Sequence, residues 1–201
     1  MAIDVHSHCL SPNLAQGLRD RTEAPWIEQL DNGQERYHMP HGTILLSEAY
    51  YDMEARIAHM DKHGVQRQIL SFPGLFGVDT LPVRDCADLL AGFNDHVSGL
   101  AKTNPNRFSG LAALPLSDMD EAVKEYRRAR LELGLVGAIL PVNLLVTEEH
   151  ATTLAPLFAT AQEIGGHIFV HPGRRPSEVP SAGSTPPGPN FVDNVQARLA
   201  L

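Results

Sequence analysis

The feature that most constrains the fold of this chain is a repeated alternation of short apolar segments with longer amphipathic ones. The short segments end at Pro or Gly, and the longer segments repeat apolar residues every three or four positions. This alternation predicts βα units that feed a parallel sheet buried on both faces. The predicted strands are residues 2–8, 65–72, 110–114, 137–140 and 167–171, and the predicted helices are residues 52–63, 83–101, 118–133 and 147–164.

Such units can build either a doubly wound sheet or a closed (β/α)8 barrel of the TIM type. No Gly-x-Gly-x-x-Gly motif follows the first strand, which counts against a dinucleotide-binding fold. Histidines lie at the carboxyl ends of strands, where barrel enzymes place their chemistry, and this favours the barrel. The chain holds about five of the eight units of such a barrel. We therefore expect one domain over residues 1–201 that is the N-terminal part of a longer protein.

Two segments interrupt the alternation. Residues 9–47 are punctuated by Pro and Gly and are predicted to form a long irregular insertion loop. This segment contains Trp26, His38 and His41, which either line a pocket or lie exposed in the loop. Residues 172–190 are rich in Pro, Gly and Ser and are predicted to form a lid-like loop before the start of a further helix.

Three histidines form a candidate metal site. His6 and His8 lie two positions apart in the first predicted strand, so they share one face and are about 7 Å apart along the backbone. His171 ends the last predicted strand. An isolated His-x-His pair is weak evidence, but a third histidine at a strand end strengthens it. Three neutral imidazoles with an open position are typical of catalytic zinc, which lowers the pKa of bound water toward 7.

Several polar residues near these strand ends have two open interpretations. Asp4 shares the face of His6 and His8, and either orients a metal ligand or is a buried acid satisfied by backbone donors. Arg174 and Arg175 follow the last strand, and either bind a substrate carboxylate or lie in solvent. Asn143 follows the fourth strand and has the same two interpretations.

Other candidate residues are expected to be structural or solvated. His59 and His63 share a helix face without a third partner, so a solvated face is expected. His167 begins a strand at the end away from the chemistry and is interpreted as structural. Cys9 and Cys86 are expected to be reduced thiols in a cytoplasmic protein, and Cys9 to pack in the interior.

Composition excludes several classes of function. The chain has 24 acidic and 16 basic residues, for a net charge of −8, and lacks the clustered Lys and Arg that bind nucleic acid. No apolar run approaches the ~20 residues of a membrane helix, and the N-terminus has no signal-peptide pattern. The histidines at the strand ends instead favour a small-molecule substrate, and a homo-oligomer stays open.

Four stretches together are similar to a known family. They are residues 3–8, 94–108, 114–116 and 169–172. In them the chain resembles the amidohydrolase superfamily, and within it the branch of aminocarboxymuconate-semialdehyde decarboxylase and related decarboxylases. The His-x-His motif is shared by the superfamily, whereas the Asn-Pro-x-Arg-Phe and Val-His-Pro motifs are more specific to this branch.

The resemblance implies that His6, His8 and His171 hold one divalent metal, usually zinc. It places a further His and a general-base Asp beyond Leu201. The implied activity is decarboxylation, a carbon–carbon lyase reaction, of a small carboxylated substrate by metal-activated water. Two alternatives stay open. One is metal-dependent hydrolysis of a C–N, C–O or C–C bond, and the other is an inactive barrel fragment that serves as a binding or assembly module.

Overall fold

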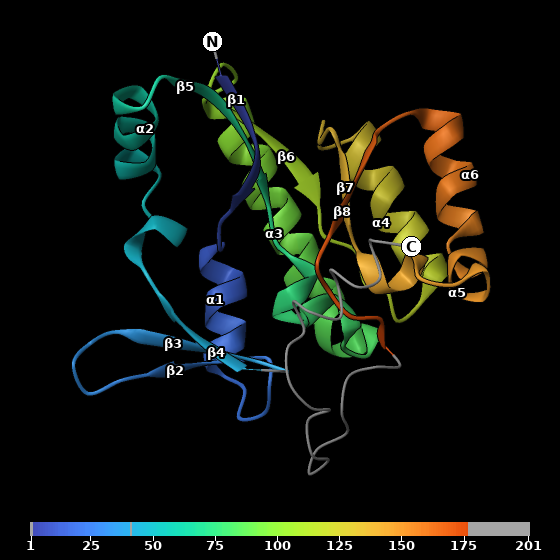
Figure 1. Cartoon of the computed structure of the whole chain (residues 1–201), viewed down its shortest axis with the longest axis horizontal. Coiled ribbons are helices and arrows are strands. Elements are labelled where there is room, and N and C mark those ends of the chain that lie inside the picture. Colours follow the sequence, from blue (N-terminus) through green and yellow to red (C-terminus); the bar gives the residue numbers. More distant parts are fainter. Residues whose placement is uncertain (1, 41, 177–201) are drawn as a thin grey trace.

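The computed structural model describes residues 2–40 and 42–176, which form a five-stranded parallel sheet and a separate three-stranded antiparallel sheet (Figure 1). The strands of the parallel sheet follow one another in space as they do in sequence, in the order β1-β5-β6-β7-β8. They are β1 (Ala2–His8), β5 (Val65–Ser71), β6 (Phe108–Ala112), β7 (Gly137–Pro141) and β8 (His167–His171). The predicted βα alternation is therefore confirmed.

Helices connect these strands and cover the outside of the sheet (Figure 1). Helix α2 packs on β5, α3 on β6, and α4 on β7 and α6. The helices are α2 (Met53–Lys62), α3 (Val83–Thr103), α4 (Met119–Leu131), α5 (Glu148–Thr153) and α6 (Ala155–Ile164). Single-turn helices η1 (Glu48–Tyr50), η2 (Gly74–Phe76), η3 (Val78–Thr80) and η4 (Val142–Leu145) lie in the connections. Within the described residues, no helix combines the length and apolar character that crossing a bilayer requires.

The parallel sheet is strongly curled. Strands β1 and β8 are its two outer strands, and four strand spacings in a flat sheet would separate them by about 19 Å. Nevertheless, Nε2 of His6 on β1 lies 3.0 Å from Nε2 of His171 on β8. Only a sheet that closes around its inner face brings these atoms together. Five parallel strands curled in this way, with helices outside, form about half of a (β/α)8 barrel.

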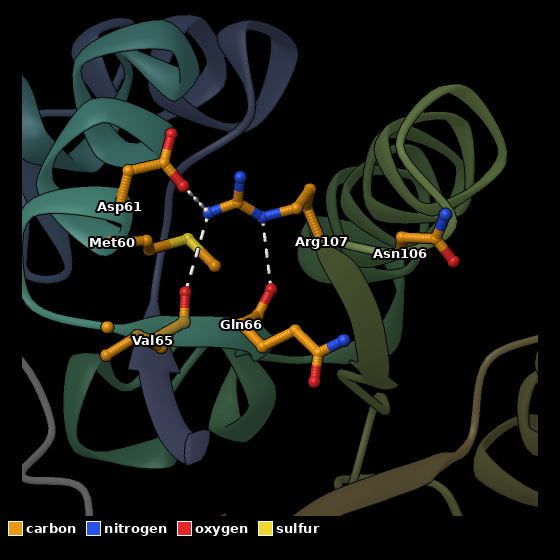
Figure 2. A pocket seen from close by; sticks show the side chains of 7 residues that line it. Met60, Asp61, Val65, Gln66, Asn106 and Arg107 are labelled. Carbon is orange, nitrogen blue, oxygen red and sulfur yellow. Dashed lines mark hydrogen bonds and ion pairs between the residues drawn. The ribbon is translucent and has the colours of Figure 1, made fainter. Parts of the chain in front are cut away.

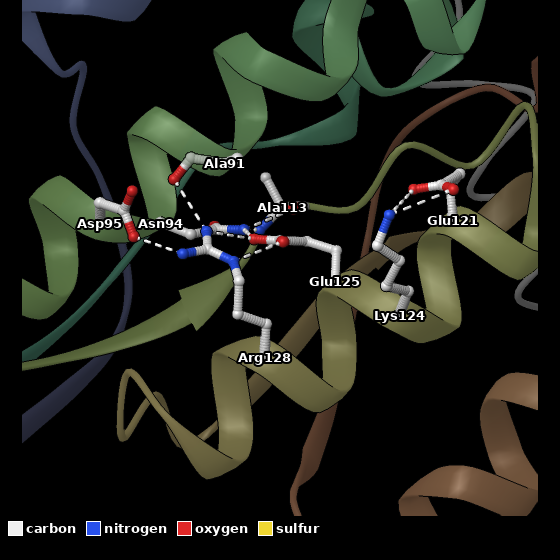
Figure 3. A network of polar contacts seen from close by, with 8 residues as sticks. All are labelled: Ala91, Asn94, Asp95, Ala113, Glu121, Lys124, Glu125 and Arg128. Atoms are coloured by element: carbon white, nitrogen blue, oxygen red, sulfur yellow. Dashed lines mark hydrogen bonds and ion pairs between the residues drawn. The ribbon is translucent and has the colours of Figure 1, made fainter.

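A polar network fastens β6 to the helices behind it (Figure 3). The side chain of Asn94 on α3 is fully buried. It accepts a hydrogen bond from the backbone N–H of Ala113 and donates to the Ala113 carbonyl. It also donates to Glu125 on α4, which in turn binds Arg128. The network therefore satisfies the backbone just after β6, where the ladder ends.

Several predicted boundaries are wrong by a few residues. Strand β6 lies two residues before its predicted position at 110–114. The helix predicted over 147–164 is two helices, because Pro156 has no N–H to donate and occupies the first turn of α6. Asp118 caps α4 as predicted, but Glu121 binds Lys124 instead of closing a capping box.

The prediction of an irregular loop over residues 9–47 is wrong. This segment folds into helix α1 (Pro12–Arg19) and an antiparallel sheet of β2 (Trp26–Gln29), β3 (Glu35–Met39) and β4 (Gly42–Leu46). The small sheet lies beside α1, at the end of the barrel where β1 terminates (Figure 1). The Pro and Gly residues mark the ends of short elements. Pro12 begins α1 behind the N-cap Ser11, and Gly33 makes the turn between β2 and β3 with φ 80°.

Candidate metal centre

The structure brings the three predicted histidines together. Nε2 of His6 lies 3.1 Å from Nε2 of His8 and 3.0 Å from Nε2 of His171. Each pair of rings has centroids 4.9 Å apart and is nearly perpendicular. Within the described residues, this is the group of His, Cys, Asp and Glu side chains whose ligand atoms converge closely enough to hold an ion.

Hydrogen bonds at the far side of two rings determine which nitrogen is available. Nδ1 of His171 lies 2.7 Å from the carbonyl of Pro172, which only accepts, so Nδ1 carries the proton. Nδ1 of His8 lies 3.0 Å from Oγ of Ser71, and this hydroxyl donates to the carbonyl of Ser7. The hydroxyl proton is thus used, and His8 donates to Ser71. Both neutral rings therefore present an Nε2 lone pair to the centre, as metal-binding histidines do.

A cation fits this arrangement better than hydrogen bonds alone. Nε2 of His6 carries at most one proton, so it can donate to His8 or to His171 but not to both. A cation at the centre would satisfy all three lone pairs together. Nitrogens bound about 2.05 Å from a tetrahedral ion are about 3.3 Å apart, close to the 3.0 and 3.1 Å separations from His6. The donor set therefore fits a divalent metal ion of the kind that imidazole binds.

Burial and mutual repulsion favour the neutral form of the His8 and His171 rings. Burial, followed by the charges of His171 and His6, lowers the pKa of His8 from 6.5 to about 3. Burial also lowers the pKa of His171. A neutral imidazole is the form that binds metal, so both shifts prepare the site for a ligand role at neutral pH.

Strand β1 is irregular where it carries the first ligand. Its register against β5 shifts between Asp4 and Ser7, so three steps along β1 match two steps along β5. The backbone N–H of His6 lies in this bulge and donates to Oδ1 of Asp4 at 3.0 Å. The other oxygen of Asp4 accepts from Gln68. Of the two interpretations of Asp4, these contacts match a carboxylate satisfied by a backbone donor.

Sequence reasoning missed residues that support the ligands. Ser71 ends β5 beside β1, and a polar residue at the end of a neighbouring parallel strand was a usable signal. Arg56 on α2 donates to the His8 carbonyl and to Ser7. It lies three residues after Met53 and four residues before Met60, so it shares their apolar helix face, and this was the signal that it points inward.

The other predicted substrate-binding residues lie at the same end of the sheet. Asn143 is buried in η4, just after β7, and its N–H lies 3.4 Å from the carbonyl of Gly173. Arg174 follows two residues after Pro172 and is partly buried. Their roles stay predictions. Most of the predicted lid, and the helix expected after it, lie outside the described residues.

The remaining candidates do not join the histidine cluster. His38 stacks on Trp26 with centroids 4.3 Å apart and binds Glu28. His59 and His63 lie beside each other and are exposed, as expected. His41 lies outside the described residues.

The interior thiols and the strand-starting histidine agree with their expected places. Cys9 is fully buried and free, and burial raises its pKa to about 12. Cys86 is also buried and free. His167 is exposed at the opposite end of β8 from His171.

Comparison with known proteins places this geometry in a family. A model of the Amidohydrolase family matches residues 3–196. The chain belongs to this family. A relative, 2-amino-3-carboxymuconate-6-semialdehyde decarboxylase of Dictyostelium discoideum, is 30% identical over 177 residues, which is 86% of this chain and 49% of the relative. The predicted resemblance is therefore confirmed at the level of the family.

Solved structures agree with the fold of an amidohydrolase. The 5-carboxyvanillate decarboxylase of Sphingomonas paucimobilis has a TM-score of 0.66 at 20% identity, over 85% of this chain and 51% of that one. A dihydroxybenzoic acid decarboxylase of Polaromonas, with bound manganese and 2-nitroresorcinol, has a TM-score of 0.57 at 20% identity, over 85% and 49%. The chain thus spans about half the length of the relatives it matches.

Proposed function

We propose that this chain is part of a metal-dependent decarboxylase that acts on a small carboxylated substrate. The observation that carries the proposal is the convergence of three imidazole Nε2 atoms, drawn from both outer strands of the half-barrel. The relatives support lyase chemistry, since they are decarboxylases of a carboxymuconate semialdehyde, a carboxyvanillate and a dihydroxybenzoic acid. Each of these molecules carries a carboxyl group, which supports the substrate class that we propose.

The residues of this chain would bind the metal ion and orient the substrate. His6, His8 and His171 would hold one divalent ion at the carboxyl ends of the strands. Arg174 would pair with the substrate carboxylate, because a guanidinium offers two parallel donors to it. Asn143 would donate from the end of β7. When bound, the ion would supply Lewis-acid polarisation of the substrate or of water.

Zinc is the ion that we propose, because three imidazoles suit it. Manganese is the alternative to test, since it is bound in the Polaromonas relative. We also propose that the further His and the general-base Asp come from a later part of the barrel. The buried free thiols and the net negative charge suit a cytoplasmic protein with a small-molecule substrate. A homo-oligomer stays open.

Metal analysis tests this proposal directly. Protein purified without a tag is loaded with Zn²⁺ or Mn²⁺, dialysed and analysed for bound metal. The wild-type chain is expected to retain about one ion, and the His6→Ala/His8→Ala variant to lose it. The matched control is His59→Ala/His63→Ala, which removes a histidine pair from an exposed helix face and should retain the ion. Equal metal in all three proteins would contradict the proposal.

A second candidate function is that of a binding or assembly module. The observation that favours it is the exposure of apolar side chains on both outer strands, with Ile3 58%, Val5 51% and Val170 43% exposed. Exposed apolar residues in a parallel sheet indicate surface that another layer covers. Turnover of a carboxylated substrate by the 201-residue chain alone would exclude this candidate as the chain's sole role.

A further inference from the structure

A guanidinium lies behind the strand that carries two of the metal ligands. Arg56, on α2, donates from Nη2 to the carbonyl of His8 at 2.8 Å and to the carbonyl of Ala49. From Nη1 it donates to Oγ of Ser7 and, at 3.2 Å, to Oε1 of Gln68. One side chain thus joins β1, β5 and the η1 turn. Planar, multidentate donation of this kind is specific to arginine.

Strand β1, which Arg56 contacts, has an irregular ladder with β5. The bulge removes His6 from the regular ladder, so its N–H bonds to Asp4 instead of β5. Arg56 also reaches this bulge indirectly, because Gln68 accepts from Arg56 and donates to Asp4 at 2.9 Å. The contacts of Arg56 therefore lie on both sides of His6, through Ser7 and His8 after it and through Asp4 before it.

The outer position of β1 in this chain adds to the effect of the bulge. β1 is an outer strand of the parallel sheet and pairs with β5 alone within the described residues. A bulge bends the strand and increases its local twist, so contacts that fix β1 at the bulge also fix the direction of its side chains. A small rotation of β1 would move Nε2 of His6 and His8 away from Nε2 of His171, which comes from the opposite edge. The geometry of the three nitrogens thus depends on a residue that contacts none of them.

We propose that Arg56 is the positioning residue of the histidine site, and that it sets the affinity and coordination geometry of the metal by fixing the bulged end of β1. This inference rests on the proposed metal binding. It adds a role that is separate from ligation, since Arg56 bonds to the His8 carbonyl and not to a ring. Partners that orient metal ligands typically contribute 10–100-fold to metal affinity.

The chain provides a matched control in Arg107, at the opposite end of β5. Arg107 pairs with Asp61 on α2 at 2.8 Å and donates to the Gln66 carbonyl at 3.0 Å and to the Val65 carbonyl (Figure 2). Like Arg56, it is partly buried and ties α2 to β5. Because it does so at the amino end of β5, its loss should leave the contacts of Arg56 with Ser7, His8 and Gln68 in place and should not move the histidines.

The test compares Arg56→Gln with Arg107→Gln in the same chain, with Co²⁺ as the probe. Circular dichroism first establishes a temperature at which each protein is folded. The Co²⁺ dissociation constant is then measured by chelator competition, and the visible absorption spectrum is recorded at saturating Co²⁺. The spectrum at saturation reports coordination geometry, which a change in the folded fraction alone does not alter. Arg56→Lys keeps the positive charge but not the planar guanidinium. It replaces Arg56→Gln if Arg56→Gln does not fold.

We expect Arg56→Gln to bind Co²⁺ at least about 10-fold more weakly, with an altered spectrum, and Arg107→Gln to match the wild type in both. Wild-type affinity and an unchanged spectrum in the Arg56 variant would overturn the inference while leaving the proposed function intact. Absence of histidine-dependent Co²⁺ binding in the wild type would overturn both, so the two failures are distinguishable.

Discussion

The middle and the edges of the parallel sheet differ sharply in how well they are covered. All five residues of β7 are buried, whereas β1 exposes Ile3 and Val5 by more than half and β8 exposes Val170 by 43%. The candidate ligands nevertheless lie on β1 and β8. The middle strands therefore connect the two edges through a buried part of the sheet, and the edges carry the candidate ligands. Residues that never approach the histidines should control whether the histidines meet.

The largest effect is expected for Gly137→Ala in β7. A Cβ at this position would lie 1.8 Å from the carbonyl oxygen of His167, which is backbone of β8. The two strands would have to separate, at a cost of about 3 kcal/mol or more of unfolding free energy, and His171 would move with β8. The urea concentration at the unfolding midpoint and the amount of bound Zn²⁺ should both decrease. The control Gly92→Ala on α3 has open space around it and should not destabilise.

Leu140→Ala and Val170→Ala compare the middle with the edge directly. Leu140 on β7 is fully buried, and its truncation should cost about 2–5 kcal/mol. Val170 on the neighbouring β8 is 43% exposed, and its truncation should cost less than about 1 kcal/mol. Urea midpoints of the two variants provide the measurement. Equal losses would mean that Val170 is covered in the protein and that the edge is not open.

This contrast also explains what could be predicted from the sequence. Inner strands are apolar runs that end at Pro or Gly, so their existence follows from local patterning, and so do the helices between them. The histidine cluster was predictable because alternation in a strand puts His6 and His8 on one face, and because carboxyl ends of parallel strands lie together. These rules need no knowledge of distant contacts.

What sequence reasoning missed depends on contacts between distant residues. The strands β2, β3 and β4 are four or five residues long and, in the part of the chain that the structure describes, pair only with one another. Such short strands show little alternation of apolar and polar residues, so the Pro and Gly residues at their ends led to the prediction of a loop. The bulge at His6 is a property of the pairing with β5, which no local window contains. Arg56 reaches partners 48 and 49 positions away, and sequence spacing does not indicate them.

Residues that follow the middle strands are also buried, and one of them is an acid. Asp79 is 5% exposed, and burial raises its pKa from 3.8 to about 8. The folded state therefore binds a proton that the unfolded state releases, so stability is lost as pH rises from about 4 to 8. As pH rises over that range, the unfolding free energy of Asp79→Asn relative to the wild type should increase by up to about 1.4 kcal/mol per pH unit. Urea denaturation at pH 5 and pH 8 measures this, and a pH-independent difference would contradict the burial of a protonated acid.

The smallest effect on stability is expected at the edge itself, in Ile3→Thr/Val5→Thr. Both side chains are more than half exposed, and threonine keeps the β-branched shape that suits a strand. The unfolding free energy of the isolated chain should change by less than about 0.5 kcal/mol. Light scattering after size-exclusion chromatography then separates two cases. If another polypeptide layer covers this edge, the double variant should lose self-association that the wild type shows, whereas an edge that faces water should give the same mass for both proteins. A large loss of stability in the monomer would instead mean that β1 is covered within the chain, and the distinction between middle and edge would fail.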